Sequence, residues 1–407
     1  MTGKSRQTTG PHVLLLDQGQ LTAPPIMHAL KRGGARVTLA VDPAGPCSAA
    51  RSRFVDAVVH RPSLADGPRF VEFARTMAGR GVEVLMPMGD AALMALQPLR
   101  PELQTIMGVA APPAECVGIA LDKGLTVQRA QHVASGPAVP VSATPGSAEE
   151  AADGWTGRFP VIVKPRVGTD TAGVRSARDR EELARAFGRV TAERGPALVQ
   201  EAVDYRPGEK FVLLYLFDDQ GGLRAQYAQR VEHECRSIRR GAGSARQRGG
   251  SALLWRSSDD PDLLRQGRAL LQILGWRGLA SIEGAYDRRD GKPYLFEINP
   301  RLDGTGPLAL AQGANLVHDA CLVALERAPV RRLDHEAGHR ARKNLLMMLG
   351  ARDLRAALAV LDPRYAPPLP IRQDPVPVAL ECVRLLRKHL SVGTMIWAGS
   401  PRQRHNP

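Results

Sequence analysis

Short apolar runs alternate with helix-like stretches in the first part of the chain. Residues 12–17 (HVLLLD) form an apolar run, a helical stretch follows to Lys31, and residues 36–42 (RVTLAVD) form a second run. This order predicts a strand, a crossover helix and a parallel strand, which open a doubly wound α/β sheet. A later parallel strand is predicted over residues 82–87 (VEVLMP), with a helix over residues 90–96 after it.

The turn after the first apolar run lacks a GxGxxG motif. Without those glycines the backbone does not form the pyrophosphate cradle of dinucleotide-binding folds. We therefore expect this part of the chain to act as a scaffold and to contribute to a substrate pocket.

Beyond residue 110, apolar runs of strand length recur between helix-like and Pro/Gly/Ser-rich segments. A helix carrying Lys123 and a Pro/Gly/Ser-rich stretch over residues 135–147 come first, and the periodicity predicts an amphipathic helix over residues 261–274. The last 70 residues are helix-patterned and Arg-rich, with Pro-rich breaks. Strands are predicted over residues 159–164, 198–203, 211–217, 279–286 and 293–298.

The composition is that of an ordinary globular protein. The 407 residues are 43% hydrophobic and 24% charged, which excludes a wholly disordered or fibrous chain. The formal net charge is +14, but Arg outnumbers Lys by 47 to 8. The high charge therefore reflects Arg usage more than a nucleic-acid or membrane partner.

Cysteine usage and hydropathy predict a cytoplasmic protein. The five cysteines lie far apart, with neither a zinc-binding spacing nor a disulfide framework. The N-terminus is polar, and the first apolar run is too short for a signal peptide. No stretch approaches 18 apolar residues, so no membrane-spanning helix is expected.

Two acidic residues are expected to face each other across a hairpin within residues 280–301. Two predicted strands, ASIEGAY and YLFEINPR, are joined by a polar linker with an Asp-Gly hairpin signal. A turn there places Glu283 roughly opposite Glu297, and Asn299 shares a face with Glu297 because strand side chains alternate. Two carboxylates and an amide oxygen suit Mg²⁺ bound together with nucleotide phosphates. The alternative is an edge hairpin whose glutamates face solvent.

Arg301 follows the second strand directly. Carboxylates brought this close need a cation, or one of them must take up a proton. An arginine at this point can meet a transferring phosphate or a carboxylate in fork geometry. Its presence favours the metal interpretation over the solvated hairpin.

Lys164 ends a buried strand and precedes a Gly/Thr-containing loop, residues 165–173. A lysine at such a place can reach a phosphate while the backbone N–H groups of the loop close over it. The alternative is a lysine that ends a strand beside a surface loop. The loop does not match GxxxxGK[ST], so a Walker-type loop is excluded.

Several of these features follow one another in a familiar order. They are Lys123, Lys164, QEAV at residues 200–203 followed by Gly208 and Glu209, then Glu283 and the EINPR segment at residues 297–301. In this order the chain resembles the ATP-grasp superfamily and, within it, the carboxylate–amine ligases. The resemblance covers about residues 12–325 and is most specific in EINPR with a second acid 14 residues upstream.

The resemblance implies an ATP-grasp fold of mixed α/β and α+β class, divided into four parts. These are an N-terminal Rossmann-like pre-ATP-grasp domain (12–110), an ATP-grasp N-terminal subdomain (111–197), an ATP-grasp catalytic subdomain (198–330) and a helical C-terminal extension (331–407).

The resemblance also implies a role for each matching residue. Lys123 and Lys164 would contact the phosphates of ATP, and Lys164 and Arg301 would act in catalysis, with Arg301 on the transferring phosphoryl group and the acyl phosphate. The remaining roles are the adenine hinge (Glu201, Ala202 and Val203), the ribose hydroxyls (Glu209) and the binding of two Mg²⁺ ions, or Mn²⁺ in their place (Glu283, Glu297 and Asn299).

The implied reaction is phosphorylation of a carboxylate by ATP, followed by attack of an amine on the acyl phosphate. The products are an amide or peptide bond, ADP and phosphate. Phosphoryl transfer depends on positioning and charge neutralisation, which lysines, arginine and bound metal supply. The rivals are an ATP-grasp enzyme that makes a thioester or carboxylated product, and a non-catalytic ATP-binding scaffold or regulatory protein.

Two residues depart from the pattern. Asp170 lies in the loop where relatives often have glycine, and its carboxylate would repel phosphate if it pointed inward. Asp303 follows Arg301 where many relatives have a neutral residue, so its role in selecting the amine is open.

Residues 230–256 contain seven arginines around a glycine-rich centre. One interpretation is a loop that closes over an acidic substrate, either an amino acid or an acidic carrier protein. The other is a solvated face in an Arg-rich chain. Aromatic residues for base stacking are nearly absent here, so no nucleic-acid partner is expected. We expect small-molecule carboxylate and amine substrates and no membrane partner; a homodimer through the first domain is left open.

Overall fold

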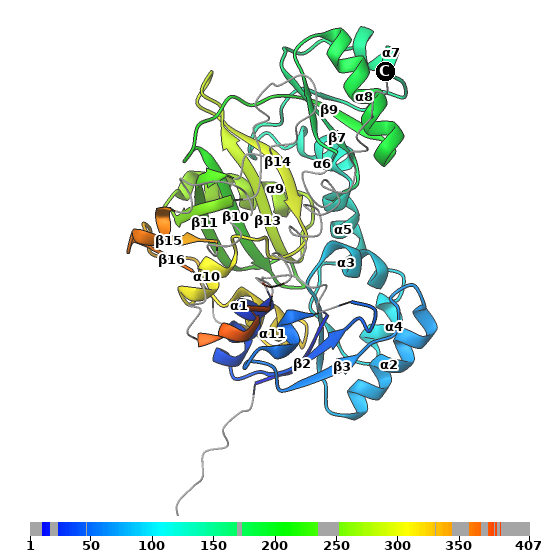
Figure 1. Cartoon of the computed structure of the whole chain (residues 1–407), viewed down its shortest axis with the longest axis vertical. Helices are drawn as coiled ribbons and strands as arrows, with labels where there is room; N and C mark the ends of the chain where they lie inside the picture. Colours follow the sequence, from blue (N-terminus) through cyan, green and yellow to red (C-terminus); the bar gives the residue numbers. More distant parts are fainter. Residues whose placement is uncertain are drawn as a thin grey trace, which may run out of the picture.

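The described residues of the computed structural model form three β-sheets (Figure 1). The structure describes residues 10–16, 23–45, 47–168, 173–234, 252–329, 331–343, 358–367, 373–377, 379–380 and 383. Within these ranges the chain runs from a five-stranded sheet, through a four-stranded sheet, to a seven-stranded sheet.

The five-stranded sheet is parallel, with strand order β3-β2-β1-β4-β5, as the opening pattern predicts. All five residues of its central strand β1 are buried because apolar clusters cover both faces. The elements are β1 (His12–Leu16), α1 (Ala23–Arg32), β2 (Arg36–Val41), η1 (Ser48–Arg51), β3 (Ala57–His60), α2 (Gly67–Gly79), β4 (Val84–Pro87), α3 (Asp90–Leu96), α4 (Arg100–Gln104) and β5 (Gly108–Val109).

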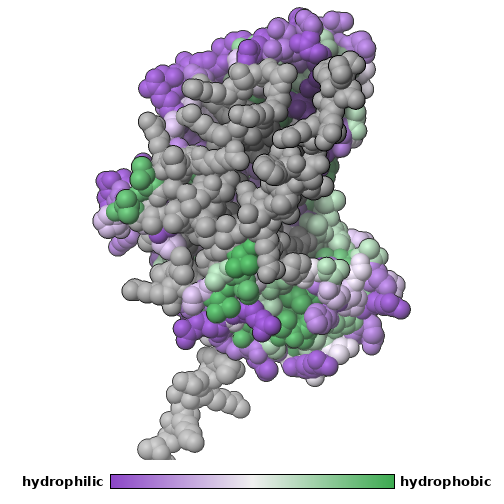
Figure 2. All heavy atoms as spheres, viewed as in Figure 1, coloured by the Kyte–Doolittle hydropathy of each residue, from purple (hydrophilic) through white to green (hydrophobic). Residues whose placement is uncertain are grey.

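The four-stranded sheet, order β6-β9-β7-β8, packs against α8 in the upper lobe of Figure 1. In the space-filling view this lobe is mostly hydrophilic, whereas apolar groups gather on the lower lobe (Figure 2). The elements here are α5 (Ala114–Leu121), α6 (Lys123–Ala130), β6 (Ser142–Ala143), α7 (Ala148–Asp153), β7 (Val161–Pro165), β8 (Arg175–Ala177), α8 (Arg180–Arg194) and β9 (Ala197–Glu201).

The seven-stranded sheet has the order β14-β13-β10-β11-β12-β15-β16. The pairs β10–β11, β10–β13, β11–β12 and β13–β14 are antiparallel. The elements are β10 (Lys210–Phe217), β11 (Leu223–Glu234), β12 (Ala252–Ser257), α9 (Pro261–Ile273), β13 (Gly278–Tyr286), β14 (Pro293–Asn299), α10 (Pro307–Ala311), α11 (Leu316–Val323), β15 (Arg340–Arg342), η2 (Ala359–Leu361) and β16 (Tyr365–Ala366).

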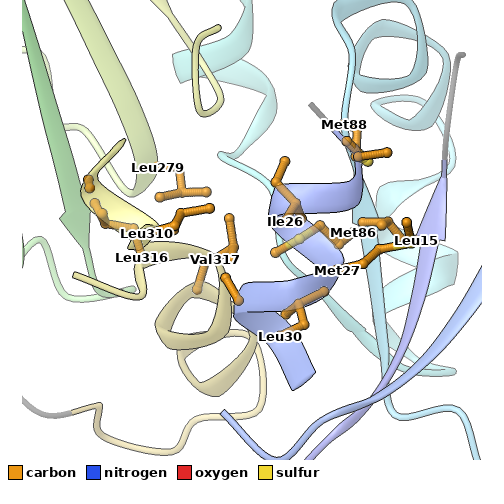
Figure 3. Packing of buried hydrophobic residues seen from close by; sticks show 14 of the residues in the cluster. Leu15, Ile26, Met27, Leu30, Met86, Met88, Leu279, Leu310, Leu316 and Val317 are labelled. Carbon is orange, nitrogen blue, oxygen red and sulfur yellow. The ribbon is translucent and has the colours of Figure 1, made fainter. Parts of the chain in front are cut away.

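An apolar cluster joins the first sheet to the seven-stranded sheet (Figure 3). Met27 and Leu30 of α1 are fully buried against Leu316 and Val317 of α11, and Leu279 of β13 belongs to the same cluster. Burial of large apolar side chains between α1 and α11 holds the two parts in one arrangement. The other face of the seven-stranded sheet packs on α9.

The C-terminal part includes strands that its helical pattern did not predict. Among its described residues, β15 pairs with β12, and β16 pairs with β15, which extends the large sheet. Short edge strands are specified by the neighbour they pair with more than by their own sequence. The boundaries of the four predicted domains stay a prediction. None of the helices in the described ranges is long and apolar enough to cross a membrane.

Candidate active site

The two acidic residues of the β13–β14 hairpin lie directly opposite each other, as the sequence predicts. Glu283 pairs with Glu297 in the register of the hairpin. The neighbouring Ile282 and Ile298 also pair, and both are buried in the apolar cluster on the α9 side. Because side chains alternate along a strand, the two carboxylates project from the opposite face.

Two lysines from the preceding part of the chain converge on this hairpin. The Nζ atom of Lys123, at the start of α6, lies 3.7 Å from Oε2 of Glu297 and donates to the Gly168 carbonyl at 2.7 Å. The Nζ atom of Lys164, on β7, donates to the Phe296 carbonyl at 3.1 Å and to Oε1 of Gln200 at 2.9 Å. The expected phosphate-binding lysines and the expected metal ligands therefore occupy one place.

Burial and neighbouring charges shift the pKa values of this cluster. Burial lowers the pKa of Lys164 to about 8, although the charge of Glu297 opposes the shift. Burial and the charge of Glu297 raise the pKa of Glu283, against the effect of Lys210. Burial acts to raise the pKa of Glu297 as well, but the ammonium groups of the nearby lysines outweigh it and lower that pKa. The pair therefore holds a proton more readily on Glu283 than on Glu297.

The donor set of the hairpin fits a hard divalent cation. Asn299 lies on the face of Glu297, and its Nδ2 atom is 3.3 Å from Oε1 of Glu283, so a turn of the amide brings Oδ1 to the same point. Among the described residues there is no group of three or more His, Cys, Asp or Glu side chains that could hold a metal ion. A metal here would therefore take the two carboxylates and the amide oxygen of Asn299.

Arg301 is held by a carboxylate from α3, the helix that follows β4 of the first sheet. Its Nε and Nη2 atoms donate to Oδ1 and Oδ2 of Asp90 at 2.5 and 2.9 Å. Asp90 lies in the first turn of α3 and is 5% exposed. Burial acts to lower the pKa of Arg301, but the hydrogen bonds and charge of Asp90 raise it. The fork geometry expected of Arg301 is thus satisfied within the chain.

Sequence reasoning missed two charged residues of this site, Asp90 and Lys210. The signal for Asp90 is its place directly after a parallel strand and a glycine, at the carboxyl edge where such sheets carry polar groups. Lys210 begins β10, and its Nζ atom lies 2.9 Å from Oε1 of Glu234 and 3.2 Å from Oε2 of Glu283. Its only sequence signal is the scarcity of lysine in the chain.

The expected adenine hinge lies at the turn end of the hairpin. Glu201 is 6% exposed, and its Oε1 atom accepts from Nε of Arg158 at 2.6 Å and lies 3.3 Å from Nη1 of Arg289. Arg289 also donates from Nη2 to the carbonyl of Ala202 at 3.0 Å. Val203 follows, buried, at the end of the segment. The carboxylate of Glu201 is therefore committed to ion pairs, and the backbone N–H groups of Glu201 and Ala202 donate to the carbonyls of Val141 and Pro160.

Glu209 lies between the hinge and the carboxylate pair. Its carboxylate accepts from the backbone N–H of Arg206 at 2.5 Å, and its carbonyl accepts from the N–H of Tyr286. Where the pairing of β13 with β14 ends, the Ser281 hydroxyl donates to the Arg301 carbonyl at 2.8 Å. From Ser281 to Tyr286 the strand spans about 17 Å, at about 3.4 Å per residue. The contacts of the hinge, of Glu209, of the carboxylate pair and of Arg301 therefore follow one another from the turn of the hairpin along β13.

Of the two residues that depart from the ATP-grasp pattern, the structure describes only Asp303. Asp170 lies outside the described residues. Asp303 is 5% exposed, and its carboxylate accepts from the backbone N–H groups of Thr305 and Gly306 at 3.0 and 3.1 Å. Its side chain therefore stabilises the turn before α10.

Only the ends of the Arg-rich segment belong to the described residues. Arg230 donates to Oδ2 of Asp260 at 2.6 Å and lies over the ring of Tyr286, and Arg256 lies 3.2 Å from Glu232. These two arginines stabilise the sheet through ion pairs. The others lie outside the described residues: Arg236, Arg239, Arg240, Arg246 and Arg248.

The sequence matches no family model and no curated protein, whereas the structure resembles solved proteins. Biotin carboxylase from Campylobacter jejuni, as its complex with β,γ-ATP, is 15% identical with a TM-score of 0.63, over 81% of this chain and 74% of that one. L-amino acid ligase from Bacillus licheniformis is 18% identical with a TM-score of 0.58, over 77% and 75%. N5-carboxyaminoimidazole synthetase from Staphylococcus aureus, with ADP, is 14% identical with a TM-score of 0.60, over 80% of each chain.

The chain has the ATP-grasp fold. The similarity to these solved structures extends over about four fifths of the chain, and at such identities it establishes the fold. Lys123 and Lys164 come from the part of the chain with the four-stranded sheet, and the carboxylates of Glu283 and Glu297 come from the seven-stranded sheet.

Proposed function

We propose that this ATP-grasp protein is an ATP-dependent carboxylate–amine ligase of the cytoplasm. The observation that carries the proposal is the convergence of Lys123 and Lys164 on the paired carboxylates of Glu283 and Glu297. A complex of a metal ion with a nucleoside triphosphate requires cationic groups for its phosphates and hard oxygen ligands for its metal.

The residues divide the work between binding and charge stabilisation. Lys164, whose pKa is about 8, becomes more basic beside a bound phosphate and so carries its charge at neutral pH. Lys123 is fixed at the start of α6, where Asp122 caps the helix through the N–H groups of Gly124 and Leu125. Both lysines would hold ATP phosphates in one position before phosphoryl transfer.

Arg301 would supply a fixed positive charge for the transferring phosphoryl group and the acyl phosphate. Asp90 holds two nitrogens of its guanidinium group, so the charge needs little reorganisation during the reaction. Glu283, Glu297 and Asn299 would hold Mg²⁺, which would supply positive charge against the phosphates during the reaction. The amine would then attack the acyl phosphate and displace inorganic phosphate.

The test is substrate-dependent release of ADP. The purified chain with Mg²⁺ and ATP is screened against pairs of amino acids and small carboxylates and amines, and amide products are identified by mass spectrometry. ADP release that needs both an acid and an amine supports the proposal. Tight ATP binding without turnover for any pair would instead identify a non-catalytic ATP-binding protein.

A carboxylating enzyme is the second candidate. Biotin carboxylase and N5-carboxyaminoimidazole synthetase are similar to this chain in fold to the same degree as the amino acid ligase. Bicarbonate is itself a carboxylate that ATP can phosphorylate, and the same lysines and acids would serve that step. ADP release stimulated by bicarbonate, and by no other carboxylate, would favour this candidate.

A further inference from the structure

Lys210 places a buried ammonium group beside the candidate metal ligands. The residue is 8% exposed. Its Nζ atom lies 2.9 Å from Oε1 of Glu234 and 3.2 Å from Oε2 of Glu283. A buried lysine is stable when it is paired with carboxylates and costs free energy when it is not. This one is paired on both sides.

The strand register fixes the lysine at that point. Lys210 pairs with Ala285, and Val212 pairs with Glu283, so the lysine and the acid lie on one face and two positions apart. On the other side, Glu234 ends β11, and its Oε2 atom accepts from the Tyr205 hydroxyl at 2.9 Å. The ammonium is therefore anchored from two neighbouring strands.

The two carboxylate oxygens of Glu283 face different groups. Oε2 faces the ammonium of Lys210, whereas Oε1 faces Asn299 at 3.3 Å. A divalent cation on the Oε1 side can take Glu297 and Asn299 as further ligands. A second one on the Oε2 side, with Mg–O distances of about 2.1 Å, would lie within about 5 Å of the ammonium and be repelled by it.

We propose that Lys210 takes the place of a second divalent cation, so that this chain binds one such ion, at Glu283 Oε1, Glu297 and Asn299. The resemblance alone implies two ions, and the difference comes from this chain's own lysine. The inference rests on the proposed function, because it concerns the cation of the same site.

The test counts Mn²⁺ bound to the full-length chain. The loss of the free Mn²⁺ signal in electron paramagnetic resonance gives the ions bound per chain, first with Mn²⁺ alone and then with one equivalent of a non-hydrolysable ATP analogue. The native chain should bind one ion with an uncoupled spectrum. Lys210→Met should bind two, with exchange coupling between ions about 3.5–4 Å apart.

Two variants serve as controls. Lys210→Arg keeps the charge and should bind one ion. Lys31→Met removes a half-buried lysine of α1 that pairs with Asp56, just before β3, and this variant should also bind one ion. If Lys210→Met fails to fold, Lys210→Met combined with Glu234→Gln removes an ammonium and a carboxylate together, and this variant should bind the second ion.

The outcomes separate this inference from the proposed function. Two ions in the native chain, none at all, or a single ion in the folded variants that lack the Lys210 charge would each overturn the inference. Two ions in the native chain together with ADP release from an acid and an amine would leave the ligase proposal intact. One ion in the native chain and two in Lys210→Met, without turnover, would support the inference and favour a non-catalytic ATP-binding protein.

Discussion

The two faces of the β13–β14 hairpin come from alternating residues of the same strands and do different work. On one face, Ile282 and Ile298 are buried against α9 with Leu213. On the other, Glu283 and Glu297 bring like charges together between lysines. Burial of the apolar face stabilises the strand register. The same register places the two carboxylates of the polar face side by side, and their repulsion costs electrostatic energy. Stability and chemistry are therefore separable at neighbouring positions.

The largest expected effect on stability is on the apolar face. Ile298→Ala removes a side chain that is 1% exposed and should lower the free energy of unfolding by about 2–5 kcal/mol, because a cavity remains. Urea unfolding measures the change. The folded fraction should retain nucleotide affinity within a few-fold, and a loss of affinity far beyond this would show that the two faces are not separable.

Substitution of Glu297, the adjacent residue on the polar face, should lower activity much more than stability. Glu297→Gln keeps the shape of the side chain but removes a charge that lies between Lys123 and Lys164. ADP release should fall on the order of 100-fold or more, as for the loss of a metal-site residue. The free energy of unfolding should change much less than in Ile298→Ala. Turnover equal to that of the native chain would remove Glu297 from the site.

The pKa of Lys164 sharpens the comparison with a pH dependence. Because its pKa is about 8 in the folded chain, Lys164 loses its charge above that pH, and nucleotide affinity should fall by up to about tenfold per pH unit. Nucleotide binding should also take up a proton near pH 8, seen by calorimetry in two buffers. Lys164→Met should remove both effects, and a native chain with flat affinity from pH 7 to 9 would contradict the assignment.

The lowered pKa of Lys164 also makes the stability of the folded chain depend on pH, in the direction opposite to that of nucleotide affinity. Unfolding returns Lys164 to its ordinary pKa, above that of the folded chain, so the unfolded state binds more protons between the two values. The contribution of this group to stability is therefore unfavourable below about pH 8 and disappears as the pH rises toward the ordinary lysine pKa. The difference in stability between the native chain and Lys164→Met should shrink over this window.

The smallest of these effects concerns the contact between Arg301 and Asp90. Asp90→Asn keeps one hydrogen bond but removes the charge that holds the guanidinium group. A charged partner adds about 1–1.5 kcal/mol to a hydrogen bond over a neutral one, so kcat should fall about tenfold or less. The KM for ATP should change little, because Asp90 contacts Arg301, whereas the proposed phosphate-binding residues are Lys123 and Lys164. An equal change in KM and kcat would point to a general loss of structure.

Local pattern predicts the hairpin because its determinants are close in sequence. The Asp-Gly turn and the alternation of Ile and Glu fix the register of residues 14 apart. The contact between Arg301 and Asp90 joins residues 211 positions apart, and nothing local indicates it. Lys210 was missed because its role depends on which strands flank β10, and strand order is a tertiary property. Strand β15, which pairs with β12 and β16, was missed for the same reason.

The ion pair between Arg301 and Asp90 also limits where the chain can be truncated. Its carboxylate belongs to α3, in the part of the chain with the first sheet, and its guanidinium to the segment after β14. A chain that began after residue 110 would keep every lysine and acid of the proposed phosphate and metal site, yet it would leave Arg301 without Asp90. The part of the chain before residue 110 is therefore not interchangeable: a transplant of the proposed site to another protein would need a carboxylate in the position of Asp90.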